Sequence, residues 1–139
     1  MSVIATDSQR PSNVLKKTDT DFVDLCNELV TVNEAGIKTY KVGTVLGKVT
    51  ATGKYKISVV GAGDGSENAI AIVMGDSFGT PQDFSVAATT DTKVLVLARG
   101  KAVVSKSALL FDASYDTAPE LAAAYASLAT VQIFAEASA

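Results

Sequence analysis

The stretch Tyr40–Thr52 reads YKVGTVLGKVTAT and combines β-branched residues with two glycines four positions apart. Valine, threonine and tyrosine favour strands, and a glycine inside a strand marks a bulge or a bend. Gly43 and Gly47 therefore predict a strongly curved ribbon over Tyr40–Thr50 instead of a flat strand. The apolar side chains of this ribbon are Val42, Val45, Leu46 and Val49.

Further β segments lie on both sides of this ribbon. Ala69–Met74 and Val94–Ala98 are continuously apolar, which is consistent with buried strands. Clusters of turn-forming residues at Asn33–Gly36 and Thr52–Lys54 separate neighbouring segments. The other expected strands are Leu29–Val32, Tyr55–Val60, Ala102–Val104 and Thr130–Ala135, and Gly75–Thr92 is expected to be a long polar connection.

One helix is predicted near the C-terminus. Thr117 and Glu120 have the spacing of a capping box, and Pro119 falls in the first turn, where its missing N–H is tolerated. One apolar face follows at helical spacing, formed by Leu121, Ala124, Tyr125 and Leu128. A single helical turn capped by Ser105 is expected over Ser105–Leu110. The fold class is therefore mainly β with one C-terminal helix.

The first 26 residues differ from the rest and are expected to form an extended N-terminal arm, Met1–Cys26, before a β-rich domain over 27–139. The arm is rich in Ser, Thr and Asp and shows no sustained period of 2 or 3.6. Two interpretations stay open: the arm docks on a partner as an added strand, or it packs on its own domain. Its spaced apolar pairs are Val3 with Ile4, Val14 with Leu15, and Phe22 with Val23.

Length and composition restrict the class of protein. The chain has 139 residues, 47% hydrophobic and 19% charged, which suits one folded domain. Its net charge is −3, and the only basic doublet, Lys16-Lys17, is soon followed by acids, so no nucleic-acid partner is expected. Neither a membrane-spanning stretch nor a signal peptide is recognisable, which predicts synthesis in a cytoplasm and no membrane partner.

Catalytic chemistry is not expected. The chain lacks histidine, which excludes Ser-His-Asp and Cys-His couples and imidazole metal ligands. The single cysteine, Cys26, cannot form an intrachain disulfide and is interpreted as a small, partly buried residue. Gly75–Gly79, GDSFG, matches the nucleophile-elbow pattern at Ser77, but it leads into a predicted loop and has no histidine base. We therefore predict no enzyme activity, no cofactor and no small-molecule substrate.

Two polar loops resemble ligand-binding motifs only superficially. Gly61–Gly65, GAGDG, lacks both the GK[ST] ending of a P-loop and the G-x-G-x-x-G spacing, so it is interpreted as a surface loop. Asp64, Glu67 and Asp76 do not have EF-hand spacing and are interpreted as solvated acids. No metal site is predicted.

At a larger scale, the chain resembles the lambda-type head decoration proteins of tailed bacteriophages. Four features carry the resemblance in order: the ribbon at Tyr40–Tyr55, the DGS loop leading to AIAIVMGD, the strand pair VLVLARGKAVV at Val94–Val104, and the capped Ala/Leu-rich helix followed by a terminal strand at Thr117–Phe134. The similarity extends over Glu28–Phe134. The N-terminal arm departs from the family pattern, and the Gly75–Asp91 loop looks long.

The resemblance implies a compact β-clip-like domain with curved ribbons. It further implies a homotrimer on the outer capsid surface of the virion, at local threefold positions, which cements neighbouring copies of the major capsid protein. In the family an N-terminal arm contacts the capsid, so the six apolar arm residues, from Val3 to Val23, are the expected contacts.

Two other classes remain as alternatives. One is another phage structural protein, such as a head fibre or tail tube subunit. The other is a biotinyl or lipoyl carrier domain, whose modified lysine sits at a hairpin tip. Lys54 follows Gly53 at such a tip, but it lacks the flanking Met or Asp-Ala of those domains.

Overall fold

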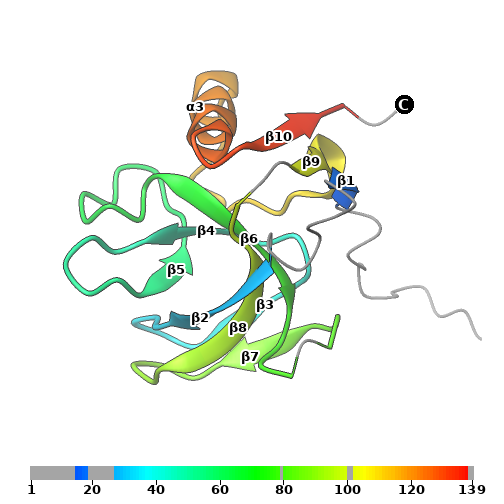
Figure 1. Cartoon of the computed structure of the whole chain (residues 1–139). Coiled ribbons are helices and arrows are strands. Elements are labelled where there is room, and N and C mark those ends of the chain that lie inside the picture. Colours follow the sequence, from blue (N-terminus) through cyan, green and yellow to red (C-terminus); the bar gives the residue numbers. More distant parts are fainter. Residues whose placement is uncertain (1–14, 19–26, 79, 100–101, 138–139) are drawn as a thin grey trace, which may run out of the picture.

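The computed structural model describes residues 15–18, 27–78, 80–99 and 102–137, and they form a mainly β fold with one α-helix near the C-terminus (Figure 1). The expected fold class is thus confirmed. In chain order the elements are β1 (Leu15–Thr18), β2 (Asn27–Val32), β3 (Lys38–Tyr40), β4 (Val45–Lys48), β5 (Tyr55–Ile57), β6 (Ala69–Gly75), β7 (Phe84–Val86), β8 (Thr92–Leu97), β9 (Ala102–Ser105), the 3-10 turn η1 (Lys106–Ala108), α3 (Ala118–Ala129) and β10 (Ile133–Glu136).

Five strands close into a barrel in the order β2–β5–β4–β6–β8. β2 pairs antiparallel with β8 over its full length, and β4 pairs antiparallel with both β5 and β6. The ring closes where β2 meets β5 in parallel through one residue pair, Val32 with Tyr55. A two-stranded sheet, β3–β7, and a three-stranded sheet, β1–β9–β10, complete the fold.

The two glycines of the ribbon bend the chain, as predicted, but the ribbon is not one strand. Gly43 has φ +103°, a backbone conformation that glycine adopts readily, and it separates β3 from β4. The pairing of β4 with β6 shifts register between Leu46 and Gly47, which is the bulge expected at that glycine. The predicted strand Tyr40–Thr50 is therefore wrong as a continuous element: β3 ends at Tyr40, and β4 ends at Lys48.

Two further strands differ from expectation. Tyr55–Val60 forms a strand only over β5, because its antiparallel pairing with β4 stops at Ile57. The long connection after Gly75 contains β7, which the sequence did not predict, and β7 exists by pairing with β3. The buried strands β6 and β8 match the predicted apolar runs to within two residues at each end.

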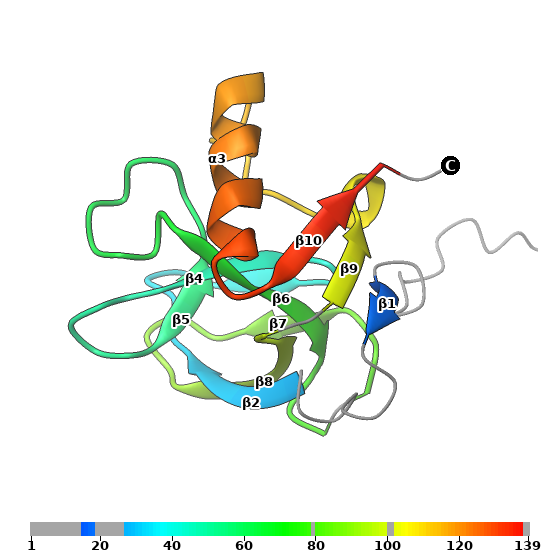
Figure 2. The same cartoon turned by 45° about the horizontal axis from the view of Figure 1, so that its top comes forward.

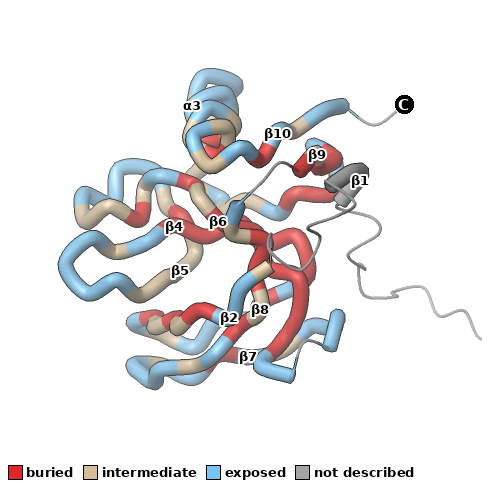
Figure 3. The backbone as a smooth tube through the Cα atoms, viewed as in Figure 1, coloured by how far each residue is buried: buried red, intermediate tan, exposed pale blue. Residues whose placement is uncertain are grey.

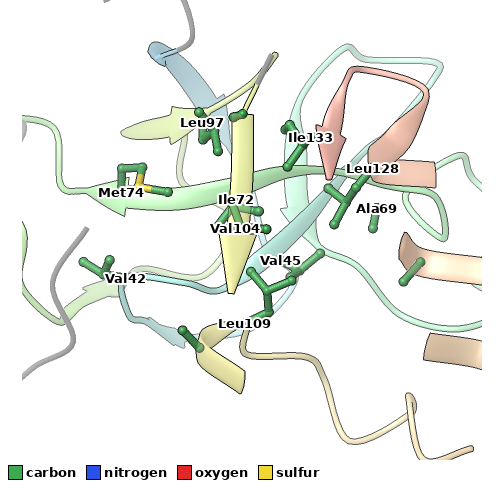
Figure 4. Close-up of a cluster of buried hydrophobic side chains, with 13 residues drawn as sticks. Val42, Val45, Ala69, Ile72, Met74, Leu97, Val104, Leu109, Leu128 and Ile133 are labelled. Atoms are coloured by element: carbon green, nitrogen blue, oxygen red, sulfur yellow. The ribbon is translucent and has the colours of Figure 1, made fainter. Parts of the chain in front are cut away.

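Two apolar clusters share the strands β4, β6 and β8 and occupy opposite faces of them. Figure 3 shows that β6 is buried along most of its length. On β6, Ala71 and Val73 belong to one cluster, while Ile72 and Met74 belong to the other. The first cluster draws side chains from β2, β4, β6 and β8, so it fills the inside of the barrel. The second, the outer cluster, lies outside the barrel, between β4 and β6 on one side and β9, α3 and β10 on the other (Figure 4). Burial on both faces explains why β6 is apolar throughout.

The C-terminal segment covers one side of the barrel. The amide of Glu120 donates to Thr117 Oγ1 at 3.4 Å, and the amide of Thr117 donates to Glu120 Oε1 at 3.1 Å, so the predicted capping box is confirmed. Ala124 and Leu128 of α3 are buried against the barrel. None of the described helices is long and apolar enough to cross a membrane.

Part of the expected arm forms a strand on the domain. β1 pairs antiparallel with β9, with Leu15 opposite Val104 and Thr18 opposite Ala102. In the sheet order β1–β9–β10, β1 is an edge strand. The arm residues Val3, Ile4, Val14, Phe22 and Val23, like Cys26, lie outside the described residues.

Candidate functional site

Several carboxylates in the described ranges accept local hydrogen bonds. Within those ranges, no three acidic or cysteine side chains group as metal ligands. Asp64 Oδ1 accepts hydrogen bonds from the amide of Ser66 at 3.0 Å and from its hydroxyl at 2.5 Å, and Lys56 lies 3.0 Å from Asp64 Oδ2. These hydrogen bonds, with the lysine charge, lower the pKa of Asp64. Asp64 therefore fastens the loop before β6.

In the described part of the GDSFG segment, Gly75 ends β6, and Ser77 and Phe78 form a turn. The next described element is the strand β7, whereas a nucleophile elbow leads into a helix. Ser77 is exposed on this loop. The neighbouring residue Asp76 organises the turn instead. Its Oδ1 accepts hydrogen bonds from the amides of Phe78 at 2.9 Å and Thr80 at 3.0 Å. The loop is thus organised around a carboxylate acceptor.

The side chain of Gln82 completes this arrangement by donating to Asp76 Oδ2 at 2.7 Å. The amide of Asp76 donates in turn to the carbonyl of Thr80 at 3.1 Å. Burial raises the pKa of Asp76, but the hydrogen bonds from Gln82, Thr80 and Phe78 outweigh burial and leave the pKa lowered. Asp76 is therefore held as a carboxylate that fixes the turn.

Phe78 projects from this turn into solvent with 91% of its surface exposed. Sequence reasoning examined its motif only for Ser77 and missed Phe78. The available signal was an aromatic residue in a stretch otherwise made of Gly, Asp, Ser, Thr, Pro and Gln. Other large apolar side chains with exposed surface are Leu29, Ile37, Val60, Leu110 and Phe134.

Four of the five ribbon residues singled out in the sequence are buried, and Val49 is half-buried. Val45 lies in the outer cluster and Leu46 in the barrel interior, so β4 is buried on both faces. Gly43 joins neighbouring segments, since its amide donates to the Val73 carbonyl at 2.8 Å. Gly47 allows the backbone of the β5–β6 loop to pack against β4, and Val49 begins the turn toward β5 with its amide bonded to the Lys54 carbonyl at 2.8 Å.

Lys54 is ion-paired and does not stand free at its hairpin. Its Nζ lies 2.9 Å from Asp91 Oδ1, and Asp91 also accepts from Asn33 Nδ2 at 2.7 Å. A carrier lysine must project from its turn to receive and swing a prosthetic group. The pairing of Lys54 therefore does not favour a carrier role.

Two hollows on the described surface are small. One, of about 210 Å³, is lined by residues that include Tyr115, Glu120 and Ser127. Another, of about 270 Å³, is lined by residues that include Lys41 and Phe111. Ligand pockets usually measure about 300–1,000 Å³. Both hollows are therefore smaller than a usual ligand pocket.

Comparison with known proteins identifies the family. The family model of bacteriophage lambda head decoration protein D matches residues 4–133, which is nearly the whole chain. The chain belongs to this family. A search of curated proteins found no match.

Membership of the head decoration family gives the chain a structural role at the phage capsid. The match begins at residue 4, so it includes most of the arm as well as the barrel and α3. The resemblance inferred from the ribbon, the DGS loop, the β8–β9 pair and the capped helix is thus confirmed. A decoration protein acts through its surfaces. The functional site of such a protein therefore consists of exposed residues that contact its neighbours.

Proposed function

We propose that this decoration protein binds the outside of a tailed-phage head as a homotrimer and stabilises the capsid lattice. The trimer would sit at local threefold positions and bridge neighbouring copies of the major capsid protein. The observation that carries the proposal is the family match over residues 4–133.

The arm, Met1–Cys26, is proposed to contact the capsid through Val3, Ile4, Val14, Leu15, Phe22 and Val23. β1 supports a route for this contact. One backbone edge of β1 is paired with β9, and no other described strand pairs with its second edge, which is proposed to take an added strand. Three arms in a trimer would act together and raise the effective concentration of each at its site.

The test compares the full chain with a truncated chain that begins at Asn27, using phage heads prepared without the decoration protein. The truncated chain retains every barrel strand and α3, so it should fold and unfold thermally near the temperature of the full chain. It should bind the heads far more weakly in cosedimentation. A full-length variant with Val3→Ser and Ile4→Ser keeps β1 and should show part of the same loss.

Equal binding by the truncated and full chains would place the capsid contact on the barrel domain and overturn the role of the arm. Electron microscopy of complete phage particles that carry the protein tests the location. Density at local threefold positions on the outer surface is the expected result. Density along the tail or in fibres would instead support a tail tube or head fibre subunit and overturn the proposed placement.

A further inference from the structure

The β6–β7 connection carries a side chain whose exposure the fold does not explain. Phe78 is 91% exposed, the highest value among the large apolar side chains with exposed surface. The backbone amide of Phe78 donates a hydrogen bond to Asp76, whereas the Phe78 ring belongs to neither apolar cluster. An aromatic side chain that becomes buried in a partner is among the strongest contributors to protein–protein affinity.

Hydrogen bonds to Asp76 hold the backbone at Phe78 and at Thr80. Asp76 is 9% exposed and accepts three hydrogen bonds, from the amides of Phe78 and Thr80 and from Gln82 Nε2, at 2.7–3.0 Å. Two of these bonds fix the backbone at and just after the phenylalanine. Binding through Phe78 would therefore cost little loop entropy, which is the condition for an effective anchor.

The surroundings of Phe78 indicate the kind of partner. Ser77, Thr80, Gln82 and Asp83 are all exposed and polar. A single aromatic anchor within a polar rim is typical of interfaces between proteins that are also soluble apart, whereas permanent subunit interfaces are more apolar. The composition therefore favours a partner met after folding over a second copy held in a permanent trimer.

The position of the turn agrees with this interpretation. In Figures 1 and 2 the β6–β7 connection lies on the same flank of the molecule as β1. A capsid protein that adds a strand to β1 would meet the same flank of the decoration domain. Resting on the function proposed above, we propose that Phe78 is a preformed anchor that inserts into an apolar pocket of the major capsid protein.

The experiment measures binding of full-length Phe78→Ala to heads prepared without the decoration protein. Loss of a central aromatic anchor should weaken binding by roughly thirtyfold or more. Ile37→Ala removes another apolar side chain that is 74% exposed, on the β2–β3 connection, and Ser77→Ala alters the same turn. Both controls should bind like the unmodified chain, and all three variants should keep its melting temperature and its oligomeric state.

Each other outcome has a definite meaning. If Phe78→Ala binds heads as tightly as the unmodified chain, the anchor is refuted while the decoration function stands. If Phe78→Ala dissociates the oligomer, Phe78 serves contact between copies and the capsid assignment is wrong. If the unmodified chain fails to bind the heads, the proposed function and the anchor both fall.

Asp76→Ala provides an independent readout because Asp76 would act only through the placement of Phe78. Alone, Asp76→Ala should weaken binding by loosening the turn. In the Phe78→Ala background, the same change should add almost nothing, whereas two independent contributions would multiply. Full additivity of the two changes would contradict the positioning role.

Discussion

At the scale of single residues, Gly47 shows the tightest packing constraint described in the fold. A Cβ at this position would lie 2.0 Å from the carbonyl oxygen of Ser66 and 2.6 Å from its carbonyl carbon. Gly65, in the loop that packs against β4, is restricted in the same way. A Cβ there would lie 2.2 Å from Thr50 Oγ1, and its φ of +101° also favours glycine. The β5–β6 loop thus packs backbone to backbone against the end of β4.

Gly47→Ala should therefore destabilise the protein strongly. The obstructing atoms belong to the backbone and cannot rotate away, so we expect a loss of about 3 kcal/mol or more in the free energy of unfolding. Gly36→Ala is the matched control, because no heavy atom lies within 4 Å of its Cβ position. It should change the free energy by less than about 0.5 kcal/mol. Denaturant titrations of both variants measure this, and equal values would contradict the packing argument.

At the scale of elements, α3 depends on its N-terminal cap. Thr117→Ala removes the hydroxyl that accepts from the Glu120 amide and should cost about 1 kcal/mol of stability. Thr117→Ser keeps the hydroxyl and should cost only a few tenths of that amount. Since α3 covers the outer cluster, the loss should appear in global unfolding by heat. A Thr117→Ala protein as stable as Thr117→Ser would show that the cap contributes nothing.

Local patterns predicted those elements whose cause is local. The capping box at Thr117, the apolar run of β6 and the bend at Gly43 each depend on a few adjacent residues. β7 has only three residues, Phe84–Val86, and forms because β3 pairs with it from about 45 positions away. Closure of the barrel is likewise a non-local pairing that no short window contains. Phe78 was missed because sequence gives the residue type but not its exposure.

At the scale of the whole molecule, acidic pH should destabilise the fold. Hydrogen bonds from Ser66, followed by the Lys56 charge, lower the pKa of Asp64, and a hydrogen bond from Lys54, followed by one from Asn33, lowers the pKa of Asp91. A lowered pKa means that the folded state prefers the carboxylate. Each carboxylate therefore contributes its full stabilisation above the pKa of the unfolded chain, which is about 3.9. This stabilisation is lost as the pH falls through the lower pKa of the folded state.

We therefore expect stability to be nearly constant from about pH 8 to pH 5, because the chain has no histidine to titrate there, and to fall below about pH 4. Asp64→Asn should make the acid decline shallower, since one titrating group with a lowered pKa is removed. Thermal unfolding as a function of pH measures both. An unchanged acid slope in Asp64→Asn would show that Asp64 titrates alike in the folded and unfolded states.

The single residue pair that joins β2 to β5 gives the barrel a seam. Every other pair of neighbouring barrel strands is held by at least three residue pairs, so breathing of the barrel should start between Val32 and Tyr55. While the seam is shut, the closed barrel limits how far other copies can pair with the edges of β2 and β5. When it parts, β2 and β5 each present unpaired backbone to neighbouring molecules. Resistance to aggregation in a concentrated pool of unassembled subunits thus depends on the single residue pair that joins β2 to β5.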